Sequence, residues 1–190
     1  MSVDPVSAEA FEERYRRSPD PWDFRSSEYE TGRYDQTIAA LGQQHYRSAF
    51  EPGCSIGELT WRLATRCDRV LAIDVSETAV ATARERCRQL PGVRVEVGSV
   101  ADLGGDDLDL VVFSEVGYYF TLPELEVVVD QLVGSLEPGG ELTACHWLGH
   151  SEDHLLHGQE VHDCVSRHPD LARRLHEDHD GFVIDSWIRS

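Results

Sequence analysis

The feature that most constrains this chain is a glycine-containing turn between an apolar run and an amphipathic run, FEPGCSIGEL at residues 50–59. Gly53 and Gly57 allow the backbone to turn tightly and to approach a ligand closely. The run 58–67 is patterned as a helix, so its first amide groups would face that ligand. A second apolar run ends at Asp74, where a carboxylate can accept hydrogen bonds from a ribose diol. Strand, loop, helix, strand and acid in this order predict a nucleoside site in an α/β sheet.

Composition narrows the class of protein. The chain has 190 residues, 41% of them apolar, which suffices for one domain with a substantial core. Its basic residues are all Arg, and its net charge of -18 repels phosphate backbones and anionic lipid surfaces. We therefore expect a small-molecule substrate, with neither nucleic acid nor a membrane as partner. No apolar run is long enough for a bilayer and no signal-peptide pattern is present, so we expect a cytoplasmic protein of undetermined oligomeric state.

The five cysteines predict neither disulfides nor a thiolate metal site. They are spread along the chain without a C-x-x-C pair, and their number is odd. Most of them fall in helix or strand patterns, where free Cys behaves as a small apolar residue. Cys54, inside the glycine loop, is the one that we expect near a ligand.

Apolar and amphipathic runs alternate regularly from Ala49 onward. This pattern favours an open, doubly wound, mostly parallel sheet with helices on both faces and the ligand beyond the carboxyl ends of the strands. The predicted strands span residues 48–52, 69–74, 93–97, 108–114, 141–147 and 182–188. The predicted helices span residues 5–17, 27–41, 57–67, 76–89, 123–136 and 151–167. The polar stretch between the last helix and the last strand has no pattern that we can assign.

Two other chemistries compete for the glycine loop. The dinucleotide fingerprint G-x-G-x-x-G would place Ser55 and Glu58 where glycines belong, and the Glu58 carboxylate would occupy the position of a pyrophosphate. GCSIG also matches the nucleophile elbow G-x-S-x-G of serine hydrolases, with Ser55 as nucleophile. However, the loop follows the first strand, Pro52 precedes the turn, and no HGGG-type segment lies upstream. A serine hydrolase and a non-catalytic nucleoside-binding module remain as alternatives.

Five motifs, in order, resemble the class I S-adenosylmethionine-dependent methyltransferases. Residues 51–57 (EPGCSIG) are similar to the acidic-x-G-x-G-x-G loop of that family, with Ser55 in place of the middle glycine. Asp74 matches the acid that holds the ribose, and SVAD at 99–102 matches the segment that flanks the adenine. LDLVVFSEVGYYF and LEPGGELTACHW match the fourth strand with its exit and the turn into the fifth strand. The resemblance implies a Rossmann-like fold and S-adenosyl-L-methionine as cofactor.

The resemblance also implies a set of cofactor-binding residues. Ser55 could instead cap a helix, and Asp74 could instead act as a helix N-cap. The implied set is Arg33, Glu51, Gly53, Ser55, Gly57, Asp74, Val75, Ser99, Val100 and Ser114.

Catalytic candidates must lie just beyond the strand ends. Glu115 follows the fourth predicted strand, where a carboxylate can bind a cationic amine or take its proton, and His146 lies near the end of the fifth. Glu115 could equally be a solvated loop residue. Four further histidines, at 150, 154, 157 and 162, do not match a zinc-binding spacing, so we predict no metal and expect a solvated or substrate-side helix there.

The segments DPWDFRSSEYETGRY and HLLHGQEVHD resemble the nodulation-protein-S-type methyltransferases. The resemblance to this family extends over nearly the whole chain. That family N-methylates a de-N-acetylated amino sugar at the end of a chitooligosaccharide; O-methylation of a small metabolite is the alternative. The resemblance implies one methyltransferase domain, residues 1–190, with an N-terminal helical lid (1–45), a cofactor-binding core (46–148) and a C-terminal helix and strand (149–190). Arg33 could then pair with the cofactor carboxylate. The implied substrate-binding residues, which could instead be packing residues, are Trp22, Tyr29, Tyr118 and Tyr119.

Overall fold

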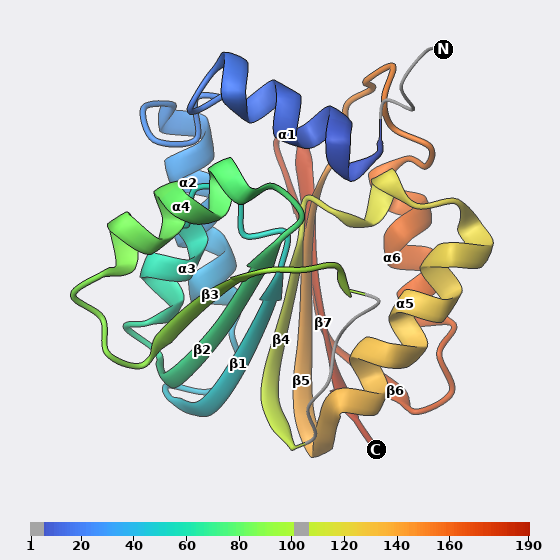
Figure 1. Cartoon of the computed structure of the whole chain (residues 1–190). Helices are drawn as coiled ribbons and strands as arrows, with labels where there is room; N and C mark the ends of the chain where they lie inside the picture. Colours follow the sequence, from blue (N-terminus) through green and yellow to red (C-terminus); the bar gives the residue numbers. More distant parts are fainter. Residues whose placement is uncertain (1–5, 101–106) are drawn as a thin grey trace.

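A seven-stranded sheet in the order β3-β2-β1-β4-β5-β7-β6 forms the centre of the computed structural model, which describes residues 6–100 and 107–190. Strands β1 to β5 pair in parallel, and β7 pairs antiparallel with both β5 and β6 (Figure 1). The doubly wound, mostly parallel sheet is therefore confirmed. The strands are β1 (Tyr46–Pro52), β2 (Cys67–Asp74), β3 (Val93–Val97), β4 (Leu108–Ser114), β5 (Leu136–Trp147), β6 (Leu171–His179) and β7 (Phe182–Arg189).

The helices begin where a side chain can cap their free amides. Ser7, Ser27 and Ser76 each accept a hydrogen bond from an amide in the first turn of α1, α2 and α4. Helix α5 begins with a capping box of Thr121 and Glu124. The helices are α1 (Ala8–Arg17), α2 (Glu28–Ala40), α3 (Glu58–Leu63), α4 (Glu77–Cys87), α5 (Leu122–Ser135) and α6 (Gly158–Ser166), and η2 (Gly117–Tyr119) is a 3₁₀ turn.

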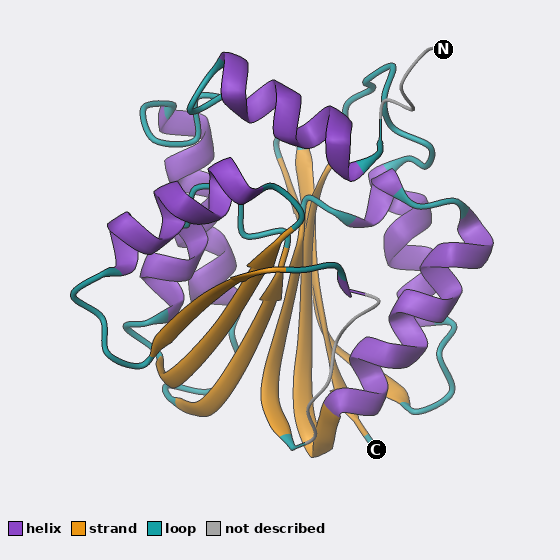
Figure 2. Cartoon of the chain, in the orientation of Figure 1, coloured by secondary structure: helices purple, strands orange, loops and turns teal. Residues whose placement is uncertain are grey.

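Strand β4 shows why helices cover both faces of the sheet. Its successive side chains alternate between two apolar clusters, because neighbouring residues of a strand point to opposite faces. Leu110 and Val112 join the cluster that contains residues of α2 and α3, whereas Val111 and Phe113 join the cluster that contains residues of α5 and α6. Figure 2 shows these helices as separate layers on either side of the sheet.

The structure corrects the predicted helix over 57–67. Helix α3 ends at Leu63, where amides of Thr65 and Arg66 bond back to carbonyls of the last turn. Cys67 therefore begins strand β2 instead of closing the helix.

The elements predicted for the C-terminal third differ more from the structure. The helix predicted over 151–167 begins only at Gly158, because an irregular loop follows β5. The unassigned stretch contains strand β6, which forms a hairpin with β7 through Asp180 and Gly181. Its polar side chains suit an edge strand, half of which faces water.

Helix α1 crosses the carboxyl ends of the central strands (Figure 1). Glu12 accepts hydrogen bonds from Ser76 and Thr78 at the start of α4, and Arg14 pairs with Asp153 at 2.8 Å. No helix among the described residues is long and apolar enough to cross a bilayer. The covered strand ends are where the ligand was expected.

Candidate functional site

A cavity of about 750 Å³ lies at the carboxyl ends of the parallel strands, beneath α1. Its size is that of a typical small-molecule site. Of the residues expected at the site, Gly57 and His146 do not line it, and Ala101 and Asp102 of the SVAD segment lie outside the described residues. The expected residues that do line it are Trp22, Tyr29, Arg33, Glu51, Gly53, Cys54, Ser55, Asp74, Val75, Ser99, Val100, Ser114, Glu115, Tyr118 and Tyr119.

The glycine loop turns sharply after β1. Gly53 has φ +72°, and a Cβ there would lie 2.0 Å from Val116, so no other residue fits without displacing the loop that follows β4. Ser55 also has a left-handed backbone, with φ 50°, which disfavours a residue with a Cβ by about 1–2 kcal/mol. Gly57 is the N-cap residue of α3 and shapes the loop from behind the cavity wall.

Asp74 is tied directly to the glycine loop. Its two carboxylate oxygens accept hydrogen bonds from the amides of Ser55, at 2.8 Å, and Ser76, at 2.9 Å. Burial raises the pKa of Asp74 above its ordinary value, and the two amide bonds act in the opposite direction. The N-cap of α4 is Ser76, so Asp74 does not fill that role. Each of its oxygens keeps a lone pair for a further donor.

Ser55 joins the loop to α1. Its hydroxyl accepts a hydrogen bond from Tyr15 at 2.5 Å, and it caps no helix. Burial raises the pKa of Tyr15 well above its ordinary value, so the phenol remains a donor. No histidine among the described residues bonds to Ser55, so the partners of a serine-hydrolase triad are not assembled around it.

Glu51 lies at the end of β1 and is buried. Thr60 donates a hydrogen bond to its carboxyl group at 2.6 Å, and no cation pairs with it among the described residues. Burial is the main reason that the pKa of Glu51 is raised to about 8. The floor of the cavity therefore holds an uncharged carboxylic acid at neutral pH.

The opposite side of the cavity is built around Arg33, which is only 2% exposed. Its guanidinium pairs with Glu115 at 2.5 Å and also with Glu30. Glu115 further accepts hydrogen bonds from the Trp147 amide, at 2.6 Å, and the Tyr118 hydroxyl, at 2.7 Å. This carboxylate thus connects helix α2, the exit of β4 and the end of β5.

Aromatic rings contribute to both sides of the cavity. Trp22 stacks on Phe24 with ring centroids 5.5 Å apart and meets Tyr15 edge-on. Tyr29 is 41% exposed and contacts Phe182 edge-on, with ring centroids 6.0 Å apart. These rings supply flat apolar surfaces at the mouth of the cavity, suited to sugar or purine faces.

His146 is fully buried and bonds to its neighbours. The amide of Gly117 donates to Nε2 at 3.1 Å, so the proton sits on Nδ1, which faces His162 Nε2 at 3.1 Å. His162 then donates through Nδ1 to Asp185 at 2.7 Å. Burial holds the pKa of His146 well below its ordinary value, which keeps the His146 ring neutral. A Cβ on Gly117 would lie 2.3 Å from Val161, so the turn fits closely over the histidine.

Three further cavity residues were not predicted from the sequence. Tyr15 and Phe11 come from α1, and Glu30 precedes Arg33 by one helical turn. The i, i+3 spacing of Glu30 and Arg33 on a helix was a usable signal for an ion pair. His154 belongs to the histidine segment for which a solvated or substrate-side helix was expected; it lines the cavity from an irregular loop after β5 instead of from a helix.

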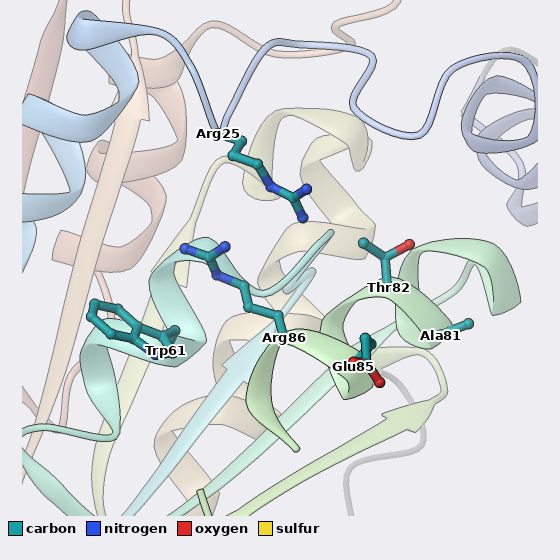
Figure 3. A pocket seen from close by; sticks show the side chains of 6 residues that line it. All are labelled: Arg25, Trp61, Ala81, Thr82, Glu85 and Arg86. Carbon is teal, nitrogen blue, oxygen red and sulfur yellow. The ribbon is translucent and has the colours of Figure 1, made fainter. Parts of the chain in front are cut away.

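A second hollow lies outside this cavity, over α3 and α4 (Figure 3). It is open to solvent, and Glu58 beneath it pairs with Arg86 and with Arg62. Glu58 does not line the cavity, so its carboxylate does not occupy a pyrophosphate position there, contrary to the prediction. The hollow is lined by Arg25, Trp61, Ala81, Thr82, Glu85 and Arg86.

The described residues contain no group of His, Cys, Asp and Glu side chains suited to a metal ion. The sheet order, the glycine loop and the acid at the end of β2 together define the class I methyltransferase fold. A solved methyltransferase, the NodS N-methyltransferase from Bradyrhizobium japonicum in complex with S-adenosyl-L-homocysteine, has this fold. It aligns with a TM-score of 0.84 and 21% identity, over 96% of this chain and 98% of that one.

The family is shown by the sequence comparisons. The model of the family described as nodulation protein S (NodS) matches residues 7–153, and the chain belongs to this family. Nodulation protein S from Rhizobium tropici is 33% identical over 65% of this chain, which spans 53% of that relative's length. A solved protein from Pseudomonas syringae, described as a methyltransferase, is 35% identical over 85% of this chain and 99% of its own, with a TM-score of 0.75.

Proposed function

We propose that this chain is an S-adenosyl-L-methionine-dependent methyltransferase that methylates the amine of a small, amino-sugar-type acceptor. The observation that carries the proposal is one cavity with two distinct sides. The glycine loop with Asp74 forms one side, and the Glu30–Arg33–Glu115 group with aromatic rings forms the other. The first side suits a nucleoside, and the second suits a cationic, polar acceptor.

The cavity residues fit the cofactor. Asp74 has one spare lone pair on each oxygen, which matches the two hydroxyl groups of a ribose. Val75 and Val100 line the cavity with apolar surface suited to an adenine ring, beside Ser99. Gly53 and Ser55, with Glu51 and Ser114, would surround the methionine end. When bound, the cofactor supplies a methyl group on a positively charged sulfur, open to in-line displacement by a nucleophile.

We assign Arg33 a role other than pairing with the cofactor carboxylate. Because its guanidinium already binds Glu30 and Glu115, we assign it to holding these carboxylates at the cavity wall. The two carboxylates outnumber the one guanidinium, so this wall attracts a substrate ammonium. Trp22, Tyr29, Tyr118 and Tyr119 would then enclose the acceptor.

His146 acts through its neighbours, since it does not line the cavity. It accepts the hydrogen bond of the Gly117 amide and thereby fixes the turn that carries Tyr118. We therefore assign it a positioning role. The negative net charge of -18 further supports a small-molecule substrate in the cytoplasm over a nucleic-acid or membrane partner.

A methyl-transfer assay with radiolabelled S-adenosyl-L-methionine tests the proposal. The acceptors are glucosamine, a deacetylated chitooligosaccharide and their N-acetylated counterparts, which keep the hydroxyl groups but lack the free amine. We expect label only in the compounds with an amine. Equal labelling of the N-acetylated compounds would show O-methylation instead, and no transfer to any acceptor despite bound cofactor would leave a nucleoside-binding module.

The Ser55→Ala variant separates methyl transfer from a serine hydrolase. Loss of its hydroxyl removes the hydrogen bond from Tyr15 and should weaken methyl transfer only a few-fold. A hydrolase would lose its nucleophile and nearly all ester hydrolysis.

A further inference from the structure

His154 lies in the loop between β5 and α6, on the acceptor side of the cavity. Its ring stacks on Tyr118 with centroids 3.7 Å apart and planes 16° apart. Tyr119 and Trp147 meet the same ring edge-on. The imidazole is thus held by aromatic rings, and His154 lines the cavity together with them.

The loop that carries His154 is fixed at two points. The amide of Leu155 donates to the Tyr118 carbonyl at 2.8 Å, directly beside the stacked rings. On the other side, Asp153 pairs with Arg14 of helix α1 at 2.8 Å. Because both neighbours of His154 are tied down, its ring keeps a defined position in the acceptor wall.

His154 differs from the other histidines near the cavity. His146 and His162 use both ring nitrogens in the buried chain to Asp185, and His157 uses both to bond Leu148 and cap α6. His150 is exposed. Among the described residues, no hydrogen bond uses either ring nitrogen of His154. It alone combines partial burial with free nitrogens at the cavity.

Glu115 is less suited to accept a proton. A carboxylate has about four lone-pair positions. Three are taken, by the Trp147 amide, the Tyr118 hydroxyl and the Arg33 guanidinium. One lone-pair position of this carboxylate stays open, which suits it to orient a cation beside His154, whose two ring nitrogens accept no other hydrogen bond among the described residues.

We propose that His154 is the catalytic base that removes the proton from the substrate ammonium. This inference rests on the proposed function. A ring nitrogen of His154 takes one proton from R–NH₃⁺ and becomes imidazolium, leaving R–NH₂. The amine lone pair then forms the N–C bond while the C–S bond breaks and its electron pair stays on sulfur. The product is the methylated ammonium with a neutral thioether, and the imidazolium returns its proton to water.

The surroundings of His154 set its working pH. Burial is the largest effect and lowers the pKa of His154 below its ordinary value, while Asp153 and Glu115 oppose the shift. His150 and His157 act with burial. Arg14 pairs with Asp153, the residue before His154. The ring is thus neutral at pH 7, and methyl transfer should fall as the pH drops through the pKa of His154.

The His154→Phe variant keeps a flat ring against Tyr118 and removes both nitrogens. We expect its kcat on glucosamine to fall about 100-fold, the size of a general-base contribution, while its affinity for S-adenosyl-L-homocysteine stays within about threefold of wild type. The acidic limb that His154 gives to the wild-type pH profile should also disappear. His154→Gln should behave alike. His45→Gln, far from the cavity and paired with Asp68 at the surface, is the matched control.

NMR of the imidazole nitrogens gives a readout without turnover. In the complex with S-adenosyl-L-homocysteine, the His154 resonances should move on addition of glucosamine and those of His45 should not. Wild-type kcat and pH profile in His154→Phe, or an unmoved His154 signal, would overturn the inference while leaving the methyltransferase intact. Absence of amine methylation by the wild type would instead overturn the proposed function.

Discussion

The two sides of the cavity are built from contacts of very different range. On the cofactor side, the amide of Ser55 bonds Asp74 only 19 residues away, and one strand–loop–helix–strand unit makes the contact. On the acceptor side, Arg14 reaches Asp153 across 139 residues of sequence. Arg33 and Glu115 likewise come from separate parts of the fold. We infer that the local unit is suited to keep one cofactor. The long-range side depends on separate loops, so a change in one loop can alter which substrate fits.

The largest effect should follow loss of the central cation of the acceptor side. Arg33→Ala leaves Glu30 and Glu115 without their shared partner in a buried site, which should lower the free energy of unfolding by about 3–5 kcal/mol. Urea denaturation measures this free energy of unfolding. Arg94→Ala, which breaks an exposed pair with Glu96, should change it by less than about 1 kcal/mol. Similar losses in both variants would show that Arg33 does not organise this side.

Glu51 tests the cofactor side through pH. Its folded pKa of about 8 exceeds the unfolded value of 4.5, so the folded chain binds more protons between these values. Stability from this group is therefore present below pH 4.5 and lost as the pH rises to 8. Glu51→Gln removes this loss, and its free energy of unfolding should exceed that of wild type by about 4 kcal/mol at pH 8 and by less than about 1 kcal/mol at pH 4.5. An equal difference at both pH values would contradict the assignment.

Asp74→Asn should weaken S-adenosyl-L-homocysteine binding by about tenfold. The amide can no longer accept two hydroxyl bonds while it also receives the amides of Ser55 and Ser76. Titration calorimetry gives the affinity, and Asp68→Asn at the surface is the control. Unchanged affinity would remove Asp74 from the ribose site.

The smallest effect concerns the link between the two sides. Tyr15→Phe deletes the hydrogen bond to Ser55 but keeps the ring, so release of S-adenosyl-L-homocysteine should become about threefold faster. Stopped-flow fluorescence measures this rate. Tyr46→Phe loses a similar buried bond, to Glu141 outside the cavity lining, and should leave the rate unchanged. If both variants release the ligand alike, α1 does not close the cavity through Ser55.

The elements of the cofactor side could be predicted from the sequence because their signals are local. Apolar runs, turn glycines and the acid at Asp74 lie within one supersecondary unit, and each can be read in a short window. Strand β6 was missed because an edge strand carries polar residues, although Asp180-Gly181 is a hairpin turn signal. The hairpin of β6 and β7 shows that such a turn signal can indicate a hairpin even where apolar alternation is weak.

The acceptor side depends on where distant loops meet, which no window of sequence records. The prediction that Arg33 binds the cofactor stays a prediction, and only the fold shows that its guanidinium also pairs with Glu115. The pattern of β5 does not tell which face of the sheet the His146 side chain occupies. Only the structure shows that it bonds Gly117 and His162 behind the cavity. His154 reaches the cavity through a loop anchored by Asp153 and Leu155, contacts that no spacing rule contains.

Titration calorimetry of the wild-type chain with S-adenosyl-L-homocysteine tests the central claim, that the cavity holds the cofactor between its two sides. The account predicts saturable one-to-one binding in the micromolar range, which Asp74→Asn weakens and Asp68→Asn leaves unchanged. Absence of binding at millimolar ligand, or binding that Asp74→Asn does not alter, would contradict it.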